Sequence, residues 1–182
     1  MDVRETCRAA VAELAEVTDR LDADAVEAAC RSIVAAGRIM VAGCGREGLA
    51  MCGLAMRLHH LGLRVSVQGD MAAPPLGPGD LFVVSVGPGR LPTMDALMEV
   101  AREAGAQVLS LTARPDLAAD ADRILHVPAQ TMADDAGGRS ILPMGSAYEG
   151  ALFVLFEAMI LRIAQITGAA PEAMRVRHTN MQ

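Results

Sequence analysis

The sequence has very few aromatic residues: one tyrosine, three phenylalanines and no tryptophan among 182 residues. Proteins that bind single-stranded nucleic acid stack the bases on such side chains, which are scarce here. Basic residues are also in the minority, because 16 lysines and arginines stand against 22 acidic residues, for a formal net charge of −6. Without a basic cluster there is no surface that follows a phosphate backbone. The composition therefore argues against nucleic acid as a partner.

Cysteine pairs and a signal peptide are also missing. The four cysteines, Cys7, Cys30, Cys44 and Cys52, form no C-x-x-C motif, and the opening "MDVRETCRAA" has no apolar core. We therefore expect a cytoplasmic protein with reduced thiols. The longest apolar stretch, "ALFVLFEAMILRIAQI", contains Glu157 and Arg162, so it favours a helix buried at an interface over a membrane span.

Hydrophobic residues make up 52% of the chain, which is enough for one well-filled core. Periodicity predicts two amphipathic helices at 3–21 and 24–36, with Asp22 or Asp24 as the cap between them. Short apolar strands and helices then alternate. The predicted strands are 38–43, 63–69, 80–86, 106–112 and 122–128, and the predicted helical segments are 47–62, 93–105, 115–121, 145–167 and 171–175.

This alternation predicts a single α/β domain over residues 1–182, in which a parallel sheet is covered by helices on both faces. Residues 1–36 form an added N-terminal helical pair, and residues 37–182 form the doubly wound, five-stranded α/β core with its C-terminal helices and tail. Such a three-layer sandwich is of the flavodoxin-like or Rossmann-like type. Ligands bind in these folds beyond the carboxyl ends of the strands.

Two glycine-rich loops fall at that edge. "GCGREG" follows the first strand and matches G-x-G-x-x-G through Gly43, Gly45 and Gly48, with Asp70 at 22 residues past Gly48. The spacing fits a dinucleotide fingerprint, although glycines also serve simply to make a tight turn and close helix packing. A short chain leaves little room for a separate substrate domain.

The second loop, "SVGPGRLPT", follows the third strand and precedes a helix. A strand, a glycine-rich turn and a helix in this order place backbone N–H groups where they can hold an anion. Ser85, Gly87 and Gly89 are the candidate ligand-binding residues here, and Thr93 is a candidate helix cap that also offers a hydroxyl. Two such loops side by side suit a small ligand with an anionic group at one end.

Four segments carry a resemblance to a known family: "GCGREGLAMCGLAMRLHHLG", "GDLFVVSVGPG", "PMGSAYEGALFVLFEAMI" and the terminal "MRVRHTNMQ". Together they resemble the sugar isomerase (SIS) domain family, and most of all its 6-phospho-3-hexuloisomerases. The resemblance implies a cofactor-independent and metal-independent homotetramer. It implies interconversion of a 3-keto and a 2-keto hexose 6-phosphate through an enediol.

The resemblance also implies roles for single residues. Glu149 takes the position of the carboxylate that moves the proton between adjacent carbons, and His178 matches a tail histidine that reaches a neighbouring subunit's site. His60 matches a position that lines the interface. A carboxylate near a helix start and a histidine can do this chemistry on general grounds. Glu149 is also favourable there through the helix dipole alone, and His178 lies in a polar tail.

The sequence departs from the family in both loops. Where the family typically has "GRSG" and "SGSGET", this chain has Glu47 in "GREG" and Arg90 at the end of "SVGPGR". We expect Arg90 to bind an anion with its guanidinium in place of hydroxyl donors. The carboxylate of Glu47 would repel that anion unless Arg46 or Arg90 pairs with it. A phosphate, sulfonate or carboxylate sugar fits, as does an unphosphorylated sugar hydrogen-bonded by Glu47.

The sequence thus predicts a sugar isomerase whose catalytic residues are Glu149 and His178. The predicted substrate-binding residues are Gly45, Arg46, Glu47, His60, Ser85, Gly87, Gly89, Arg90 and Thr93. Two alternatives stay open: a non-catalytic regulatory module that binds a sugar phosphate, and an NAD-dependent oxidoreductase. Neither a metal nor a membrane is expected among the partners.

Overall fold

Five parallel strands form one sheet in the order β2-β1-β3-β4-β5. The computed structural model describes residues 2–118, 121–137 and 140–181. The strands are β1 (Ile39–Gly43), β2 (Val65–Val67), β3 (Leu81–Ser85), β4 (Gln107–Thr112) and β5 (Arg123–His126). The chain moves outward from β1 to β2, then returns past β1 to β3, so the order reverses between β1 and β3. This is the predicted doubly wound sheet.

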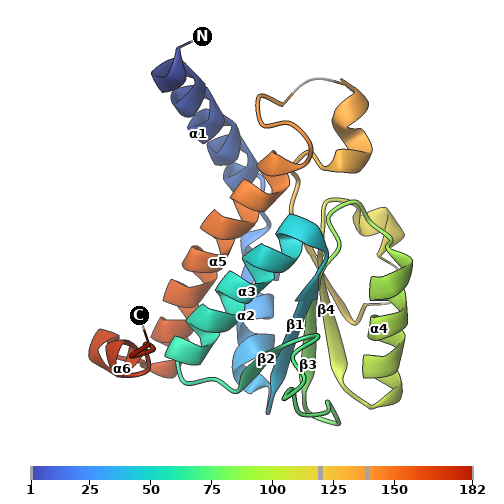
Figure 1. Cartoon of the computed structure of the whole chain (residues 1–182), viewed down its shortest axis with the longest axis vertical. Coiled ribbons are helices and arrows are strands. Elements are labelled where there is room, and N and C mark those ends of the chain that lie inside the picture. Colours follow the sequence, from blue (N-terminus) through green and yellow to red (C-terminus); the bar gives the residue numbers. More distant parts are fainter. Residues whose placement is uncertain (1, 119–120, 138–139, 182) are drawn as a thin grey trace.

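Helices cover both faces of the sheet and give three layers (Figure 1). The helices are α1 (Val3–Asp19), α2 (Ala23–Ala35), α3 (Gly45–His60), α4 (Pro92–Glu103), α5 (Ser146–Thr167) and α6 (Pro171–Val176). One core cluster joins α2, α3 and α5 to the sheet, and a second joins α4 to the opposite face. The long α1 packs against α5 and extends beyond the sheet, as Figure 1 shows.

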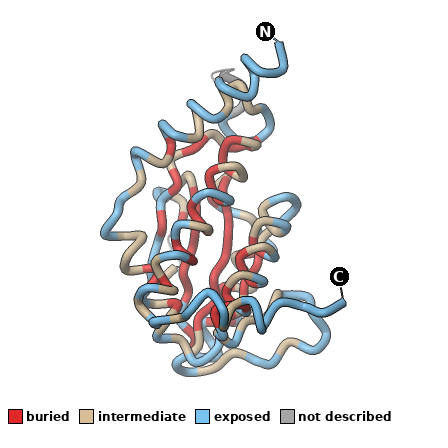
Figure 2. Tube along the Cα trace, turned by 90° about the vertical axis from the view of Figure 1, so that its left-hand side faces the viewer, coloured by how far each residue is buried: buried red, intermediate tan, exposed pale blue. Residues whose placement is uncertain are grey.

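The strands divide their side chains between these two clusters by alternation. In β3, Leu81 and Val83 belong to the cluster of α2, α3 and α5, while Phe82 and Val84 belong to that of α4. All five residues of β3 are buried, which explains why this strand is a continuous apolar run. Figure 2 shows the buried residues as a central column with exposed loops and termini around it.

Helix α5 holds the larger cluster together. It contacts α1, α2 and α3, and nine of its residues are buried, among them Tyr148, Leu152 and Ile163. By length and composition it is the one described helix that is apolar enough to cross a membrane. Its contacts make it the core helix of this domain.

The structure shortens or changes some predicted elements. The predicted strand 63–69 is paired only over Val65–Val67, because it lies at the sheet edge and has β1 as its single neighbour. The predicted helical segment 115–121 is the 3₁₀ turn η1 (Pro115–Leu117), and residues 119 and 120 lie outside the described residues. The 3₁₀ segment η2 (Met132–Gly137) was not predicted.

The link between α1 and α2 is capped as predicted. Asp22 is the N-cap of α2 and its side chain accepts hydrogen bonds from the backbone N–H groups of Asp24 and Ala25 at 2.9 and 3.2 Å. The sequence analysis missed a second cap at the start of α1, where Asp2 and Glu5 form a capping box.

Candidate active site

A cavity of about 420 Å³ opens at the carboxyl ends of β1 and β3, against the start of α5. Its lining comes from the start of α3, the β3–α4 loop, the segment at 131–132 and the start of α5. The lining residues are Cys44, Gly45, Arg46, Glu47, Pro88, Leu91, Thr131, Met132, Met144, Gly145, Tyr148 and Glu149. Larger hollows of about 630 and 840 Å³ lie elsewhere, one at the amino ends of the strands and one beside α1. We assign the site to the smaller cavity because the fold places ligands at the carboxyl ends.

Arg46 joins the start of α3 to the start of α5. Its Nε lies 3.0 Å from Oε2 of Glu149, and its Nη1 donates to Oγ of Ser146 at 2.9 Å. Its Nη2 donates to the carbonyl oxygen of Met144. All three guanidinium nitrogens are therefore engaged, and they hold the Glu149 carboxylate in one orientation at the cavity wall.

The backbone before α5 adopts an unusual conformation to allow this. Met144 has a φ of 56° and is the one described non-glycine residue with positive φ. Gly145 follows at a φ of 81° and is the N-cap of α5. These two residues turn the chain so that the Met144 carbonyl meets Arg46 and Glu149 falls in the first turn of the helix. Strain of this kind in a cavity wall is typical of functional sites.

The environment of Glu149 makes it a stronger base than an exposed glutamate. Burial raises the pKa of the Glu149 carboxyl, the positive charge of Arg46 lowers it, and the negative charge of Glu47 raises it again. The net direction is upward. A carboxylate with a raised pKa is better matched to taking a proton from carbon near neutral pH.

Glu47 lies between the two glycine-rich loops and is hydrogen-bonded to the second one. Its Oε2 accepts from Oγ of Ser85 at 2.6 Å and from the backbone N–H of Gly87 at 2.9 Å. Ser85 and Gly87 are the donors that the sequence analysis assigned to the ligand. A pairing with Arg46 or Arg90 would relieve the repulsion between Glu47 and an anion, but Arg46 forms its ion pair with Glu149 and Arg90 forms one with Asp95.

Tyr148 lies on the buried side of the contact that Glu47 makes with Ser85 and Gly87. It is buried, and its hydroxyl lies 3.3 Å from Oγ of Ser85. A Cβ added at Gly87 would come within 2.8 Å of the Tyr148 ring and 2.9 Å of Oε1 of Glu47. Only glycine therefore fits at position 87. Burial raises the pKa of Tyr148, so its hydroxyl stays protonated and able to donate.

The glycines of the first loop serve close packing. A Cβ at Gly48 would come within 2.6 Å of the carbonyl oxygen of Gly43, which is a clash with backbone. Gly45 has a φ of 57° at the start of α3. The G-x-G-x-x-G spacing is thus explained by the turn and by the approach of α3 to β1.

Three other predicted ligand residues lie outside the contact between Glu47 and the β3–α4 loop. Arg90 bonds through Nε to Oδ2 of Asp95 at 3.0 Å and is largely exposed. Gly89 is buried with a φ of 108°. The prediction that Thr93 caps α4 is wrong: the helix begins at Pro92 and its N-cap is Leu91. Proline at the first helical position sets the helical φ and needs no N–H partner, so the helix starts before Thr93.

The two predicted histidines lie at the other end of α3. His60 is buried at the last residue of this helix, and its ring stacks on that of His178 with 5.2 Å between centroids. The sixteen residues of α3 separate them from the cavity by roughly 24 Å. Burial lowers the pKa of His60, with the charges of His178, Arg57 and His59 acting in the same direction. Within one chain, His178 is therefore remote from Glu149.

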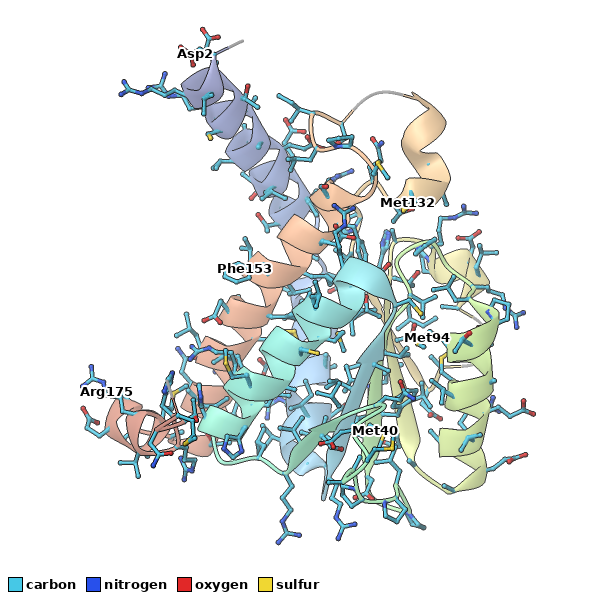
Figure 3. All side chains as sticks on the ribbon, in the orientation of Figure 1. Asp2, Met40, Met94, Met132, Phe153 and Arg175 are labelled. Carbon is cyan, nitrogen blue, oxygen red and sulfur yellow. The ribbon has the colours of Figure 1, made fainter. Side chains whose placement is uncertain are left out.

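Most residues of the cavity wall were not predicted from the sequence. Tyr148 could have been found there, since it is the single tyrosine of the chain and directly precedes Glu149. Thr131 and Met132 could not have been found, because no motif or periodicity marks the segment that brings them to the cavity (Met132 is labelled in Figure 3). Among the described residues, no group of three His, Cys, Asp or Glu side chains is placed to hold a metal ion.

Proteins of known name resemble this chain along most of its length. A 3-hexulose-6-phosphate isomerase of Mycobacterium gastri is 37% identical over 172 residues, covering 93% of this chain and 86% of the relative. The chain belongs to the SIS family of sugar isomerases. A second 3-hexulose-6-phosphate isomerase, from Bacillus subtilis, is 31% identical over 82% of this chain and 83% of its own. No family model matches the sequence.

Solved structures agree on the fold. A Methanococcus jannaschii protein, whose structure was used to infer a 3-hexulose-6-phosphate isomerase function, has a TM-score of 0.84 at 20% identity, covering 98% of this chain and 99% of its own. The sugar isomerase domain of the RpiR transcription factor from Sphaerobacter thermophilus has a TM-score of 0.72 at 21% identity, covering 95% of this chain and 93% of its own. The fold thus occurs in enzymes and regulators alike. The named relatives above 30% identity place this SIS protein with the isomerases.

Proposed function

We propose that this sugar isomerase moves a proton between adjacent carbons of a ketohexose phosphate through an enediol, with Glu149 as the group that carries the proton. The observation that supports it is the carboxylate of Glu149, held by Arg46 at the wall of the cavity with a raised pKa. The relatives from Mycobacterium gastri and Bacillus subtilis act, by name, on 3-hexulose 6-phosphate, which makes that compound the first to assay.

The proton leaves carbon and is returned to the neighbouring carbon by the same carboxyl group. Removal of a C–H proton beside a carbonyl leaves an enediolate, and the oxygens at both carbons then exchange a proton. Tyr148 and Thr131 line the cavity and offer hydroxyl groups for hydrogen bonds to the sugar. No electrons leave the sugar, so the reaction is balanced without a redox partner.

We also propose that the site is completed by a second subunit. In one chain His178 stacks on His60, at the end of α3 far from Glu149. A histidine on a neighbouring copy of the chain can instead reach the cavity and move the oxygen-bound proton. This proposal includes the predicted homotetramer and a cytoplasmic location.

The test is to incubate the purified chain with 3-hexulose 6-phosphate and to follow the appearance of the 2-keto hexose 6-phosphate by ¹³C NMR. Turnover that survives dialysis against a chelator supports the proposal. No conversion of this compound, nor of other ketose and aldose phosphates or their unphosphorylated forms, would contradict it and would favour the regulatory module.

A further inference from the structure

The first part of the β3–α4 loop, residues 86–89, directs its hydrogen-bond donors to groups inside the protein. The N–H of Val86 donates to the carbonyl of Leu111, and that of Gly89 donates to the carbonyl of Val86, both at 2.9 Å. Pro88 has no N–H. The backbone of Ser85 belongs to strand β3, and the two further donors, the Ser85 hydroxyl and the Gly87 N–H, both reach Oε2 of Glu47.

Glu47 therefore fills the place that a small anion would take in this loop. One carboxylate oxygen receives a hydroxyl and an amide hydrogen bond, which is how such a turn holds a phosphate or carboxylate oxygen. The contact is enclosed, since Ser85, Gly87 and Tyr148 are all buried. A ligand anion would have to displace Glu47 to reach these donors.

The charges nearby do not favour such a displacement. Arg46 is engaged by Glu149, Ser146 and Met144, and Arg90 forms an ion pair with Asp95. Glu47 is held by neutral donors, so its negative charge stays in the cavity wall beside that of Glu149. Glu47 and Glu149 both line the cavity, and only the Glu149 carboxylate is paired there with the guanidinium of Arg46, so an incoming phosphate would meet the carboxylate of Glu47 at this loop.

We infer that Glu47 is the specificity-determining residue of this cavity: it occupies the anion seat formed by Ser85 and Gly87, so that the sugar presents an uncharged, hydroxyl-bearing end to this loop. Glu47 lines the cavity, and its Oε1, whose hydrogen-bond capacity is not used by Ser85 or Gly87, is the acceptor for a sugar hydroxyl. The inference rests on the proposed function for the identity of the ligand as a sugar. A phosphate on the substrate then lies away from Ser85 and Gly87.

The experiment uses inorganic phosphate as the probe and the ¹⁵N-labelled full-length protein. The backbone amide signal of Gly87 reports binding at the seat, and we expect it not to shift saturably in the wild type at millimolar phosphate. Glu47→Ser removes the carboxylate, and its Gly87 signal is expected to saturate at a phosphate concentration at least tenfold lower than any wild-type response.

Glu47→Gln tests whether Glu47 excludes phosphate by filling the seat or by its negative charge, and Glu99→Ser is the control. Glu47→Gln keeps the shape and an acceptor oxygen without the negative charge, so its seat stays filled and its response stays like the wild type. Glu99→Ser removes an exposed carboxylate from α4 and is expected to change nothing. Cooperative thermal unfolding of each variant shows that it is folded.

A wild-type Gly87 signal that saturates with phosphate as readily as that of Glu47→Ser would overturn the inference. A Glu47→Gln response equal to that of Glu47→Ser would overturn it as well, because charge alone would then exclude the anion. If Glu47→Ser does not fold, the wild-type and Glu47→Gln titrations still decide. The proposed isomerisation is assayed separately with sugar substrates, so a protein without turnover would contradict that proposal and leave the phosphate titration readable.

Discussion

At the scale of single residues, the site depends on two neighbouring carboxylates with different partners. Glu149 is held by the guanidinium of Arg46, and Glu47 is held by the neutral donors Ser85 and Gly87. Burial raises the pKa of both carboxyl groups. The charge of Arg46 opposes this rise at Glu149, and the hydrogen bonds from Ser85 and Gly87 oppose it at Glu47. The same residue type thus has two roles, set by its surroundings.

The charge of Arg46 predicts a shift in the pH profile of turnover. The base that we propose, Glu149, must be ionised to take a proton, so kcat/KM is expected to fall as the pH drops below its pKa. Arg46 lowers that pKa, and Arg46→Gln removes this effect. We expect the acidic limb of the kcat/KM profile to move to higher pH in Arg46→Gln. Arg162→Gln, which breaks the ion pair with Glu27 on α2, serves as the control and should leave the limb in place. A limb that moves to lower pH, or not at all, would show that Arg46 does not tune the base.

Four of the predicted site residues, Gly45, Arg46, Glu47 and Glu149, line one cavity, but the contacts between them were not predicted. Arg46, Glu47 and Glu149 line one cavity because each stands beside the carboxyl end of a strand or in the first turn of a helix. The pairing of Arg46 with Glu149 joins residues 103 positions apart, and no local pattern encodes it. Thr93 was misplaced because a proline at the first helical position outweighed the capping preference of a hydroxyl residue.

At the scale of elements, the start of α3 positions both Arg46 and Glu47. The helix begins directly after β1, with Gly48 packed against the carbonyl of Gly43. Strong apolar runs made β1, β3 and β4 predictable, and alternation with helices made the parallel sheet predictable. The length of the edge strand β2 was overestimated, because this strand pairs with a single neighbour, β1. Thr131, Met132 and Met144 line the cavity but lie in stretches of sequence without periodicity, so their place in the wall could not be predicted.

Two glycines on α3 provide a matched pair of tests. Gly48→Ala places a Cβ at 2.6 Å from the Gly43 carbonyl oxygen, whereas Gly53→Ala on the same helix meets nothing within 4 Å. We expect Gly53→Ala to raise the free energy of unfolding by about 0.5–1 kcal/mol, through helix propensity. We expect Gly48→Ala to lower it by about 1–3 kcal/mol, as overpacking does. Urea denaturation measures both, and a Gly48→Ala variant as stable as Gly53→Ala would contradict the close packing of this loop.

At the scale of the whole molecule, an apolar face remains outside the core. Phe153 and Leu161 on α5 are 70% and 64% exposed, and Leu49 on α3 is 71% exposed. Figure 3 shows Phe153 on the outer side of α5, directed away from the sheet. Exposed apolar residues gathered on neighbouring helices are typical of subunit interfaces. This face is where we expect another copy of the chain to bind.

Disruption of this face should therefore dissociate the assembly. Phe153→Asp places a charge on α5 and is expected to yield a smaller species by size-exclusion chromatography with light scattering. Val100→Asp is the control, since Val100 is 60% exposed on α4, on the opposite side of the sheet. A wild-type monomer at micromolar concentration would contradict the interface, as would equal effects of the two substitutions.

A shared site predicts complementation between two inactive variants. Glu149→Gln and His178→Ala each lack one catalytic group, but a mixed pair of subunits contains one site with both groups intact. Co-refolding equal amounts should restore about a quarter of the wild-type activity, because half of the pairs are mixed and each has one complete site. Restoration of no activity would place both groups in the same chain, whereas full activity of His178→Ala by itself would remove His178 from the mechanism.

The central claim is that Glu149 carries the carbon-bound proton, and hydrogen exchange in D₂O tests it most directly. Wild-type protein should incorporate deuterium at the reacting carbon of 3-hexulose 6-phosphate or its 2-keto product, as seen by NMR. In Glu149→Gln both this exchange and kcat should fall by about 10²- to 10⁴-fold, since the amide cannot accept the proton, while substrate binding measured by calorimetry is retained. Exchange at the wild-type rate in Glu149→Gln would contradict the account.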